Sequence, residues 1–239
     1  MLTVFEIVSL MTIAVAHLFA LRFKRHLPEA TRWLQDFSCG LGLGYAFLYL
    51  LPKIGSMTGQ IALRQPEAHV LVEHQLYVYL FGGFLAYYLI DFGAEAVRFA
   101  RVRMAFTTLS FLIYNVLVGI TIVHINEPAV AFYVVSSLVF VLHLFGVNSF
   151  LISHYADDFL SWMRFAFVAA VAAGGLIGTQ IEKYDPYQSV ATAIVGGIVI
   201  ILSIRLKLPA RELINTRAFL LGVTVMIAAV VIYAAGDMR

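Results

Sequence analysis

The sequence has little charge, since only 13% of its 239 residues are Asp, Glu, Lys or Arg. A soluble domain carries roughly a quarter charged residues, so this chain cannot cover itself with a water-facing surface. Cysteine is also scarce: Cys39 is the single one, which excludes an internal disulfide and any thiolate cluster for metal or redox chemistry. The first apolar stretch lacks a basic segment before it and a small-residue cleavage site after it. We therefore expect a retained span there and not a signal peptide.

Long apolar stretches fill most of the chain, which is 62% hydrophobic with a mean hydropathy of +0.89. A helix needs about 20 mostly apolar residues to cross a bilayer, and eight stretches qualify. They run near Leu2–Leu21, Trp33–Leu51, Gln75–Val97, Met104–His124, Ala129–His154, Phe165–Ile181, Ser189–Leu206 and Ala218–Ala235. The sequence therefore predicts an all-α polytopic membrane protein, with a single membrane domain over residues 1–239 in contact with the lipid bilayer.

Basic residues indicate the orientation of the chain, because short loops rich in Lys and Arg stay on the cytoplasmic side. The odd-numbered loops hold Arg22, Lys24, Arg25, Arg32, Arg98, Arg101, Arg103, Arg164, Arg205, Lys207, Arg211 and Arg217. The even-numbered loops hold only Lys53, Arg64 and Lys183. We therefore expect both termini outside the cytoplasm. The net charge of +2 comes from these short loops and gives no indication of nucleic-acid binding.

Glycines mark the places where neighbouring helices are expected to approach closely, since lipid offers no hydrophobic drive for helix association. They occur at Gly40, Gly42, Gly44, Gly82, Gly83, Gly174 and Gly178. The longest connection, Lys53–His74, contains glycine and proline and is expected to be a flexible outer segment. The other connections are short, so each helix must pack against its neighbours within the membrane.

A weak internal repeat links the second and seventh spans, each of which ends in Leu-Pro beside a basic residue. Pro52 follows Leu51 and precedes Lys53, and Pro209 follows Leu208 shortly after Lys207. With the orientation above, Pro52 lies outside and Pro209 inside. Spans one to three and six to eight would then be inverted repeats, with spans four and five between them. Inverted repeats are the architecture of many secondary transporters, whose substrate sites lie near the bilayer midplane.

Polar side chains of the fourth and fifth spans need an explanation, because polar groups at membrane depth are costly. Helical periodicity places Thr107, Ser110, Tyr114 and Thr121 on one face of the fourth span, with Asn115 beside it, and Ser136, His143 and His154 on one face of the fifth. One interpretation is a buried histidine that bridges two helices. The other places these residues along a transport path between the two helices. His17 and His124 are placed near helix ends, where they need no special role.

Several motifs, in order along nearly the whole chain, resemble those of the ZIP family of divalent metal transporters. The glycine-spaced second span leads to Tyr49-Leu50-Leu51-Pro52, where the family has His-Leu-Leu-Pro. The fourth span, Tyr114-Asn115-Val116-Leu117-Val118-Gly119, matches the family's His-Asn-x-Pro-Asp/Glu-Gly. The fifth, His143-Leu144-Phe145-Gly146-Val147-Asn148, matches His-Glu-x-Pro-Glu-Gly. The resemblance implies a three-plus-two-plus-three inverted bundle of eight helices with both termini outside.

The departures from the family pattern concern the metal ligands. Only Asn115 and His143 survive at the metal-binding positions that the resemblance implies. The fourth-span histidine and acid are replaced by Tyr114 and Val118, and the fifth-span acids by Leu144 and Val147. Zinc prefers three or four N, S or O ligands, and one imidazole with one amide does not provide them. A high-affinity binuclear zinc site at the family position is therefore not expected.

Two functions remain open from the sequence. The first is a divergent ZIP-like transporter of a divalent cation such as zinc, with His143 and Asn115 as ligands and the hydroxyl face as a hydrated path. The second is a ZIP-fold protein that has lost metal transport and acts as a membrane interaction or regulatory subunit, or carries a non-metal substrate. An enzyme is not expected, because neither a zinc triad nor a nucleophile with a base is found. We expect no bound cofactor, a bacterial inner-membrane location and a plausible homodimer.

Overall fold

The computed structural model describes residues 3–64, 72–96, 100–124, 130–181, 186–205 and 215–237. The helices, some of them in continuous runs, are α1 (Val4–His26), α2 (Pro28–Tyr45), η1 (Ala46–Leu50), α3 (Leu51–Arg64), α4 (Val72–Ala96), α5 (Ala100–Val123), α6 (Val130–His154), α7 (Ala156–Asp158), η2 (Phe159–Met163), α8 (Arg164–Gly178), α9 (Pro186–Arg205) and α10 (Thr216–Asp237). Within the described residues, six helical segments are long and apolar enough to cross a membrane. The prediction of an all-α integral membrane protein is therefore confirmed.

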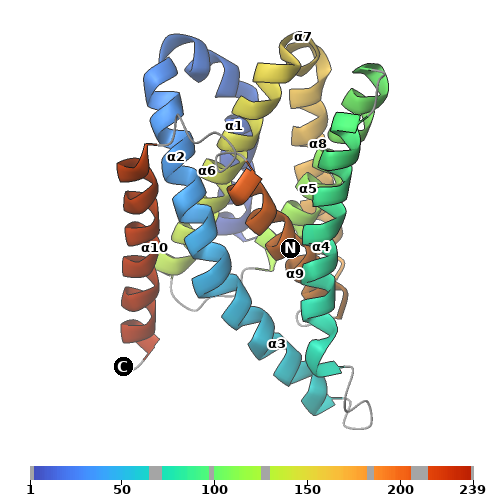
Figure 1. Ribbon diagram of the computed structural model, residues 1–239. Coiled ribbons are helices and arrows are strands. Elements are labelled where there is room, and N and C mark those ends of the chain that lie inside the picture. Colours follow the sequence, from blue (N-terminus) through green and yellow to red (C-terminus); the bar gives the residue numbers. More distant parts are fainter. Residues whose placement is uncertain are drawn as a thin grey trace.

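The ends of the helices gather at the two ends of the bundle (Figure 1). The α1–α2 turn, the start of α5 and α7 lie at one end, and the end of α10 lies at the other end with the end of α3 and the start of α4. Large apolar side chains such as Val8, Phe81 and Ile232 are exposed on the outer helices. In water such an exposed apolar surface would favour aggregation, but in this protein it is the surface that contacts lipid.

The helix that contains α2 continues past Pro52, which corrects the expectation of a flexible segment over Lys53–His74 for its described part; residues 65–71 lie outside the described residues. Residues 51–64 form α3, and Val72–His74 already belong to α4. Proline has no N–H, so an ordinary helix is interrupted at this point. The chain accommodates Pro52 with the π-helical turn Ala46–Leu50, in which the N–H of Leu51 donates to the carbonyl of Ala46, five residues earlier.

Glycines bring three pairs of helices into backbone contact, as the sequence predicts for most of them. A Cβ at Gly40 would overlap the carbonyl of Phe219 on α10, and a Cβ at Gly174 would overlap that of Val116 on α5. The pairs are α2 with α10, α4 with α9, and α5 with α8. Gly82 is an exception, because nothing lies within 4 Å of the position its Cβ would take.

Polar side chains join α1 to α6, which run in the same direction. Ser9 Oγ lies 2.8 Å from Ser137 Oγ, and Lys24 Nζ donates to the carbonyl of Ser149 at 2.7 Å and to Ser153 Oγ at 2.5 Å. These partners lie at matching heights along the two helices, since each pair is separated by a similar number of residues in the sequence. The α1–α6 pair is thus held by side chains, whereas the glycine-bearing pairs are held by close packing.

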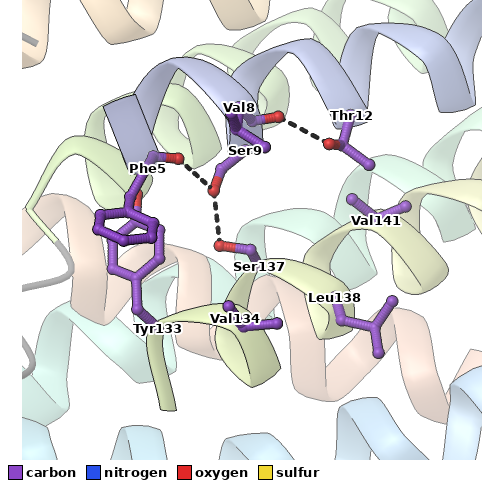
Figure 2. A pocket seen from close by; sticks show the side chains of 9 residues that line it. All are labelled: Phe5, Val8, Ser9, Thr12, Tyr133, Val134, Ser137, Leu138 and Val141. Carbon is purple, nitrogen blue, oxygen red and sulfur yellow. Dashed lines mark hydrogen bonds between the residues drawn. The ribbon is translucent and has the colours of Figure 1, made fainter. Parts of the chain in front are cut away.

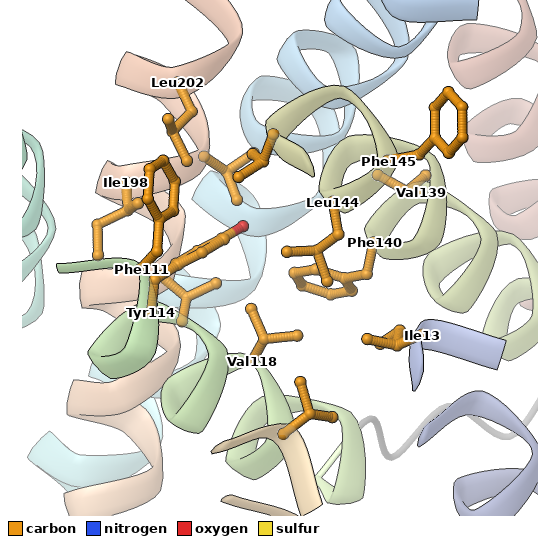
Figure 3. Packing of buried hydrophobic residues seen from close by; sticks show 14 of the residues in the cluster. Ile13, Phe111, Tyr114, Val118, Val139, Phe140, Leu144, Phe145, Ile198 and Leu202 are labelled. Carbon is orange, nitrogen blue, oxygen red and sulfur yellow. The ribbon is translucent and has the colours of Figure 1, made fainter. Parts of the chain in front are cut away.

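The main hydrophobic cluster takes residues from α1, α2, α4, α5, α6, α8, α9 and α10, and a smaller cluster joins α3, α4 and α9. Figure 3 shows the centre of the main cluster, where Phe111 and Val118 of α5 face Phe140 and Leu144 of α6. Asp36 of α2 is the one buried acid among the described residues, and it accepts a hydrogen bond at 3.1 Å from the backbone N–H of Asn215, just before α10. This bond fixes the start of α10, where helix N–H groups lack partners.

Candidate functional site

Two clusters of buried polar residues lie in the middle of the bundle, and neighbouring residues of α5 contribute to each. Asn115 belongs to the amide cluster, which we define as His17, Asn115 and Asn148. Tyr114 belongs to the open cluster, which we define as Tyr114, His143 and Ser203. Successive residues of a helix point about 100° apart, so adjacent side chains reach different neighbours. Asn115 and His143, the two residues predicted as metal ligands, therefore have different surroundings.

The amide cluster joins α1, α5 and α6 through one histidine. The ring of His17 is 0% exposed, and its Nδ1 lies 2.9 Å from Asn148 Oδ1 while its Nε2 lies 2.8 Å from Asn115 Oδ1. Asn115 Nδ2 donates to the carbonyl of Phe111 at 2.8 Å, and Asn148 Nδ2 to that of Ala16 at 3.4 Å. Every side-chain polar atom of this cluster therefore has a partner.

A neutral imidazole donates one hydrogen bond and accepts another, so one of the two amides must present its NH₂ group to the ring. Asn115 is held firmly by its 2.8 Å bond to Phe111, whereas Asn148 is held by a bond of 3.4 Å. Asn148 is therefore the amide that can turn. The phenyl ring of Phe167, with its centroid 5.6 Å from that of His17, covers the imidazole from α8.

Sequence reasoning missed His17 and Asn148, because His17 was placed near a helix end. In the structure α1 extends to His26, so residue 17 lies well inside the helix and is completely buried. The signal was present in the sequence: an ionisable residue inside a membrane span points to a polar partner on another helix. His124, the other histidine placed near a helix end, is buried at 5% exposure.

The open cluster contrasts with the amide cluster, because its polar atoms lack partners. The hydroxyl of Tyr114, Nε2 of His143 and Oγ of Ser203 are buried and make no hydrogen bond. The rings of Tyr114 and His143 meet edge to face, with their centroids 6.2 Å apart. Figure 3 shows Tyr114 near Phe111, Val118 and Leu144, so its ring packs within the hydrophobic core.

Gly42 of α2 provides the space beside His143 and Ser203. A Cβ on Gly42 would lie 2.8 Å from Ser203 Oγ and 3.2 Å from His143 Nδ1. Both distances are too short for an ordinary contact, so these side chains approach α2 only because residue 42 is glycine. Helices α2, α5, α6 and α9 thus each contribute one wall to the open cluster.

The remaining predicted path residues have mixed surroundings. Thr121 and Ser136 are buried, and their hydroxyls have no hydrogen-bond partner. Ser110 donates to the carbonyl of Thr107 at 2.8 Å, which satisfies its hydroxyl within α5. The backbone of His154 belongs to α6, but its side chain lies outside the described part of the chain. Among the described residues, no three His, Cys, Asp or Glu side chains group closely enough to hold a metal ion.

A groove of about 170 Å³ lies on the surface between α1 and α6 (Figure 2). Its walls are mostly hydrocarbon, for example Val8, Tyr133 and Leu138. The polar atoms at its base are already bonded: Ser9 Oγ contacts Ser137 Oγ and donates to the carbonyl of Phe5, and Thr12 Oγ1 donates to that of Val8. The groove therefore presents an apolar surface, as expected of a surface in contact with lipid.

Comparison of the sequence and structure with models of known protein families, with curated proteins and with solved structures found no match. The description of the site accordingly depends on its own geometry.

Proposed function

We propose that this protein is a membrane transporter of the inverted-repeat kind, a divergent relative of the ZIP transporters, with its substrate path beside α5 and α6. One repeat is α1, α2 and α4, and the other is α8, α9 and α10. The symmetry between them also exchanges α5 with α6. The first support is the packing of the helices. This symmetry exchanges α1 with α8, α2 with α9, α4 with α10 and α5 with α6. It therefore turns the α2–α10 pair into the α9–α4 pair. It also turns the α5–α8 pair into α6–α1, and all four pairs are major contacts of the bundle.

The second support is the register of the glycines in those pairs. Gly40 of α2 faces the carbonyl of Phe219 and the N–H of Val223 on α10. In the related pair, Gly197 of α9 faces the carbonyl of Leu80 and the N–H of Phe84 on α4. In both pairs one glycine thus faces the carbonyl of one residue and the N–H of the residue four positions later.

The reciprocal glycines agree with this register. Gly222 of α10 faces the carbonyl of Phe37, three positions before Gly40, and Gly83 of α4 faces that of Ile194, three positions before Gly197. Pro52 follows Gly40 by twelve positions, and Pro209 follows Gly197 by the same number. The Leu-Pro repeat and the helix contacts therefore have the same alignment.

The depth of the open cluster suits a substrate site. Gly42, which borders it, lies eleven positions before Lys53 at the end of the apolar part of this helix. At 1.5 Å per residue this is about 16 Å, close to half of the roughly 30 Å hydrocarbon thickness of a bilayer. Inverted-repeat transporters bind their substrates at this depth.

The single observation that carries the proposal is the set of buried polar atoms without partners: Tyr114 OH, His143 Nε2, Ser203 Oγ, Thr121 Oγ1 and Ser136 Oγ. Each unsatisfied buried group costs about 1–3 kcal/mol, so retaining several in one region favours a role in binding. Hydroxyls, amides and imidazoles are the polar groups that α5 and α6 contribute in this region, and all of them can be neutral. The cargo that suits such groups best is a small, uncharged, hydrogen-bonding solute.

A divalent cation is the second candidate, because His143 offers an imidazole nitrogen without a partner and imidazole is a common metal ligand. Water carried with the cation would supply the further oxygen ligands. In this case Tyr114 and Ser203 would contact the hydration shell and not the metal itself.

The test is flux into proteoliposomes that contain the purified protein. Swelling in glycerol, urea and formamide reports neutral solutes, and an enclosed indicator reports zinc, iron, manganese and cadmium. We expect neutral-solute flux that Tyr114→Phe and His143→Ala each reduce at least tenfold, with Ser110→Ala as the control on the same helix. Flux of metals alone would establish the second candidate. Folded protein without flux of any of these probes would contradict the proposal of a transporter.

A further inference from the structure

A small pocket lies at the end of the bundle where α2, α5 and α9 meet, on the line from the open cluster to the membrane surface. Its free volume is about 10 Å³, room for roughly one water molecule. Its lining includes Tyr45, Tyr49, Lys53, Thr121, His124 and Thr192. The pocket is thus polar on three sides, although it lies within helices that are otherwise apolar.

Lys53 brings a permanent positive charge to this pocket. Its ammonium group folds back along the helix, donates to the hydroxyl of Tyr49 at 2.8 Å and lies 5.1 Å from the centroid of the Tyr49 ring. Hydrogen bonding and the attraction of a cation to an aromatic ring both favour this position. Lys53 directly follows Pro52, so the π turn Ala46–Leu50 that accommodates the proline also sets the direction of Tyr49 and Lys53.

The pocket and the open cluster share one helix and adjoin each other along it. Tyr45 lines the pocket and lies one turn from Gly42, which borders His143 and Ser203. From the opposite side, Thr121 lines the pocket with a buried hydroxyl that has no partner, two turns along α5 from Tyr114. The buried polar groups therefore form a series that runs from Lys53 toward the middle of the bundle.

We propose that Lys53, held on Tyr49, is a specificity-determining residue at the outer entrance of this path. Its charge excludes free cations and admits neutral or anionic solutes. This inference rests on the proposed transport function, since a charge filter has a purpose only on a path. The field of the ammonium group is little screened in a narrow pocket enclosed by apolar helices. His124 also lines this pocket.

The test measures access to Thr121 with small thiol reagents and needs no knowledge of the substrate. In a Cys39→Ala background, Thr121→Cys is treated in detergent with methanethiosulfonates bearing a sulfonate, a quaternary ammonium or only a methyl group. We expect the anionic reagent to react faster than the cationic one by about threefold or more. Lys53→Gln should abolish this preference, and Lys53→Arg, which keeps the charge, should preserve it.

Ser110→Cys is the matched control, because Ser110 is a buried hydroxyl residue of the same helix and is not part of the pocket lining. Its ratio of anionic to cationic labelling should be the same with Lys53 and with Gln at position 53. If Lys53→Gln leaves the ratio of anionic to cationic labelling at Thr121→Cys unchanged, the proposal is overturned. Failure of all three reagents to label Thr121→Cys, even after Lys53→Ala, would overturn it as well.

The labelling and the flux experiments fail independently. A charge preference at Thr121→Cys without flux of any probe would retain the filter and reject the cargo tested. Solute flux together with equal labelling by the anionic and cationic reagents would retain the transporter and reject Lys53 as its filter.

Discussion

The amide cluster and the open cluster are adjacent in the fold and opposite in character. Asn115 and Tyr114 are consecutive in the sequence, and both side chains are completely buried. Asn115 uses its amide oxygen and nitrogen in hydrogen bonds to His17 and Phe111, whereas the hydroxyl of Tyr114 has no partner. A polar group with its partners built in holds helices together, and one without them is available to bind. On the proposed function, the amide cluster serves structure and the open cluster serves binding.

The largest expected effect is the loss of stability from His17→Leu. This change removes the imidazole from between two buried amides, so the groups of Asn115 and Asn148 that contact the ring lose their partner. At about 1–3 kcal/mol for each unsatisfied group, the loss should be about 3 kcal/mol or more. Thermal unfolding in detergent, followed by circular dichroism, measures it. The comparison variant, His143→Leu, should lose much less, and equal losses would remove the distinction between the two clusters.

A double-mutant cycle sharpens the same comparison at the level of a single hydrogen bond. His17→Ala and Asn148→Ala, alone and together, should show a coupling energy of roughly 0.6–1.7 kcal/mol, the range found for hydrogen bonds between membrane helices. The equivalent cycle with Tyr114→Ala and His143→Ala should show less coupling, because those side chains meet only through their rings. Coupling in the second cycle that equals the first would show that the open cluster has internal bonds.

Tyr114→Phe tests whether the open cluster serves function and not stability. Removing a buried hydroxyl without a partner should leave the free energy of unfolding unchanged or raise it by about 1 kcal/mol. Flux of the substrate should fall in the same variant. A substantial loss of stability would mean that the hydroxyl already has a partner in the folded protein, which would place Tyr114 with the structural residues.

The smallest expected effect belongs to Ser137→Ala, which removes one hydroxyl pair between α6 and α1. Ser9 keeps its bond to the carbonyl of Phe5 at 2.8 Å, so little remains unsatisfied. We expect a loss of about 0.5 kcal/mol in thermal unfolding and no change in flux. A loss comparable to that of His17→Leu would show that the polar contacts between α1 and α6 act as one unit.

The sequence predicted the helices well, since hydrophobic runs of sufficient length have few alternatives in a membrane. It failed at Pro52, where the expected end of a helix is a π turn followed by α3. The failure has a physical cause. Proline removes one backbone hydrogen bond of the helix, and the sequence does not show whether neighbouring residues shift to hydrogen bonds with the carbonyl five residues earlier. Gly82 and Gly83 illustrate the same limit, because only Gly83 faces another helix.

The candidate site was predicted in its parts and not in its arrangement. Helical periodicity correctly placed Tyr114 and His143 on faces that meet, and their rings are in contact. The resemblance paired His143 with Asn115 as metal ligands, and this pairing stays a prediction. In the structure the side chain of Asn115 forms hydrogen bonds with His17 and Phe111. Periodicity gives the direction of a side chain on its own helix. The identity of the opposite helix depends on packing over the whole bundle, which is why the contribution of α1 was not predicted.

The backbone contacts at Gly40, Gly174 and Gly197 have a mechanical consequence. Two helices whose backbones touch cannot slide or roll independently without separating. Each pair that is in backbone contact through a glycine therefore moves as one rigid unit. The pairs α2–α10, α4–α9 and α5–α8 are three such rigid units. The fourth pair, α1–α6, is linked by side chains. Relative motion is therefore confined to the joints between these rigid units. The open cluster spans such joints, because Tyr114 and Ser203 belong to two of the units and Gly42, which borders Ser203, belongs to the third.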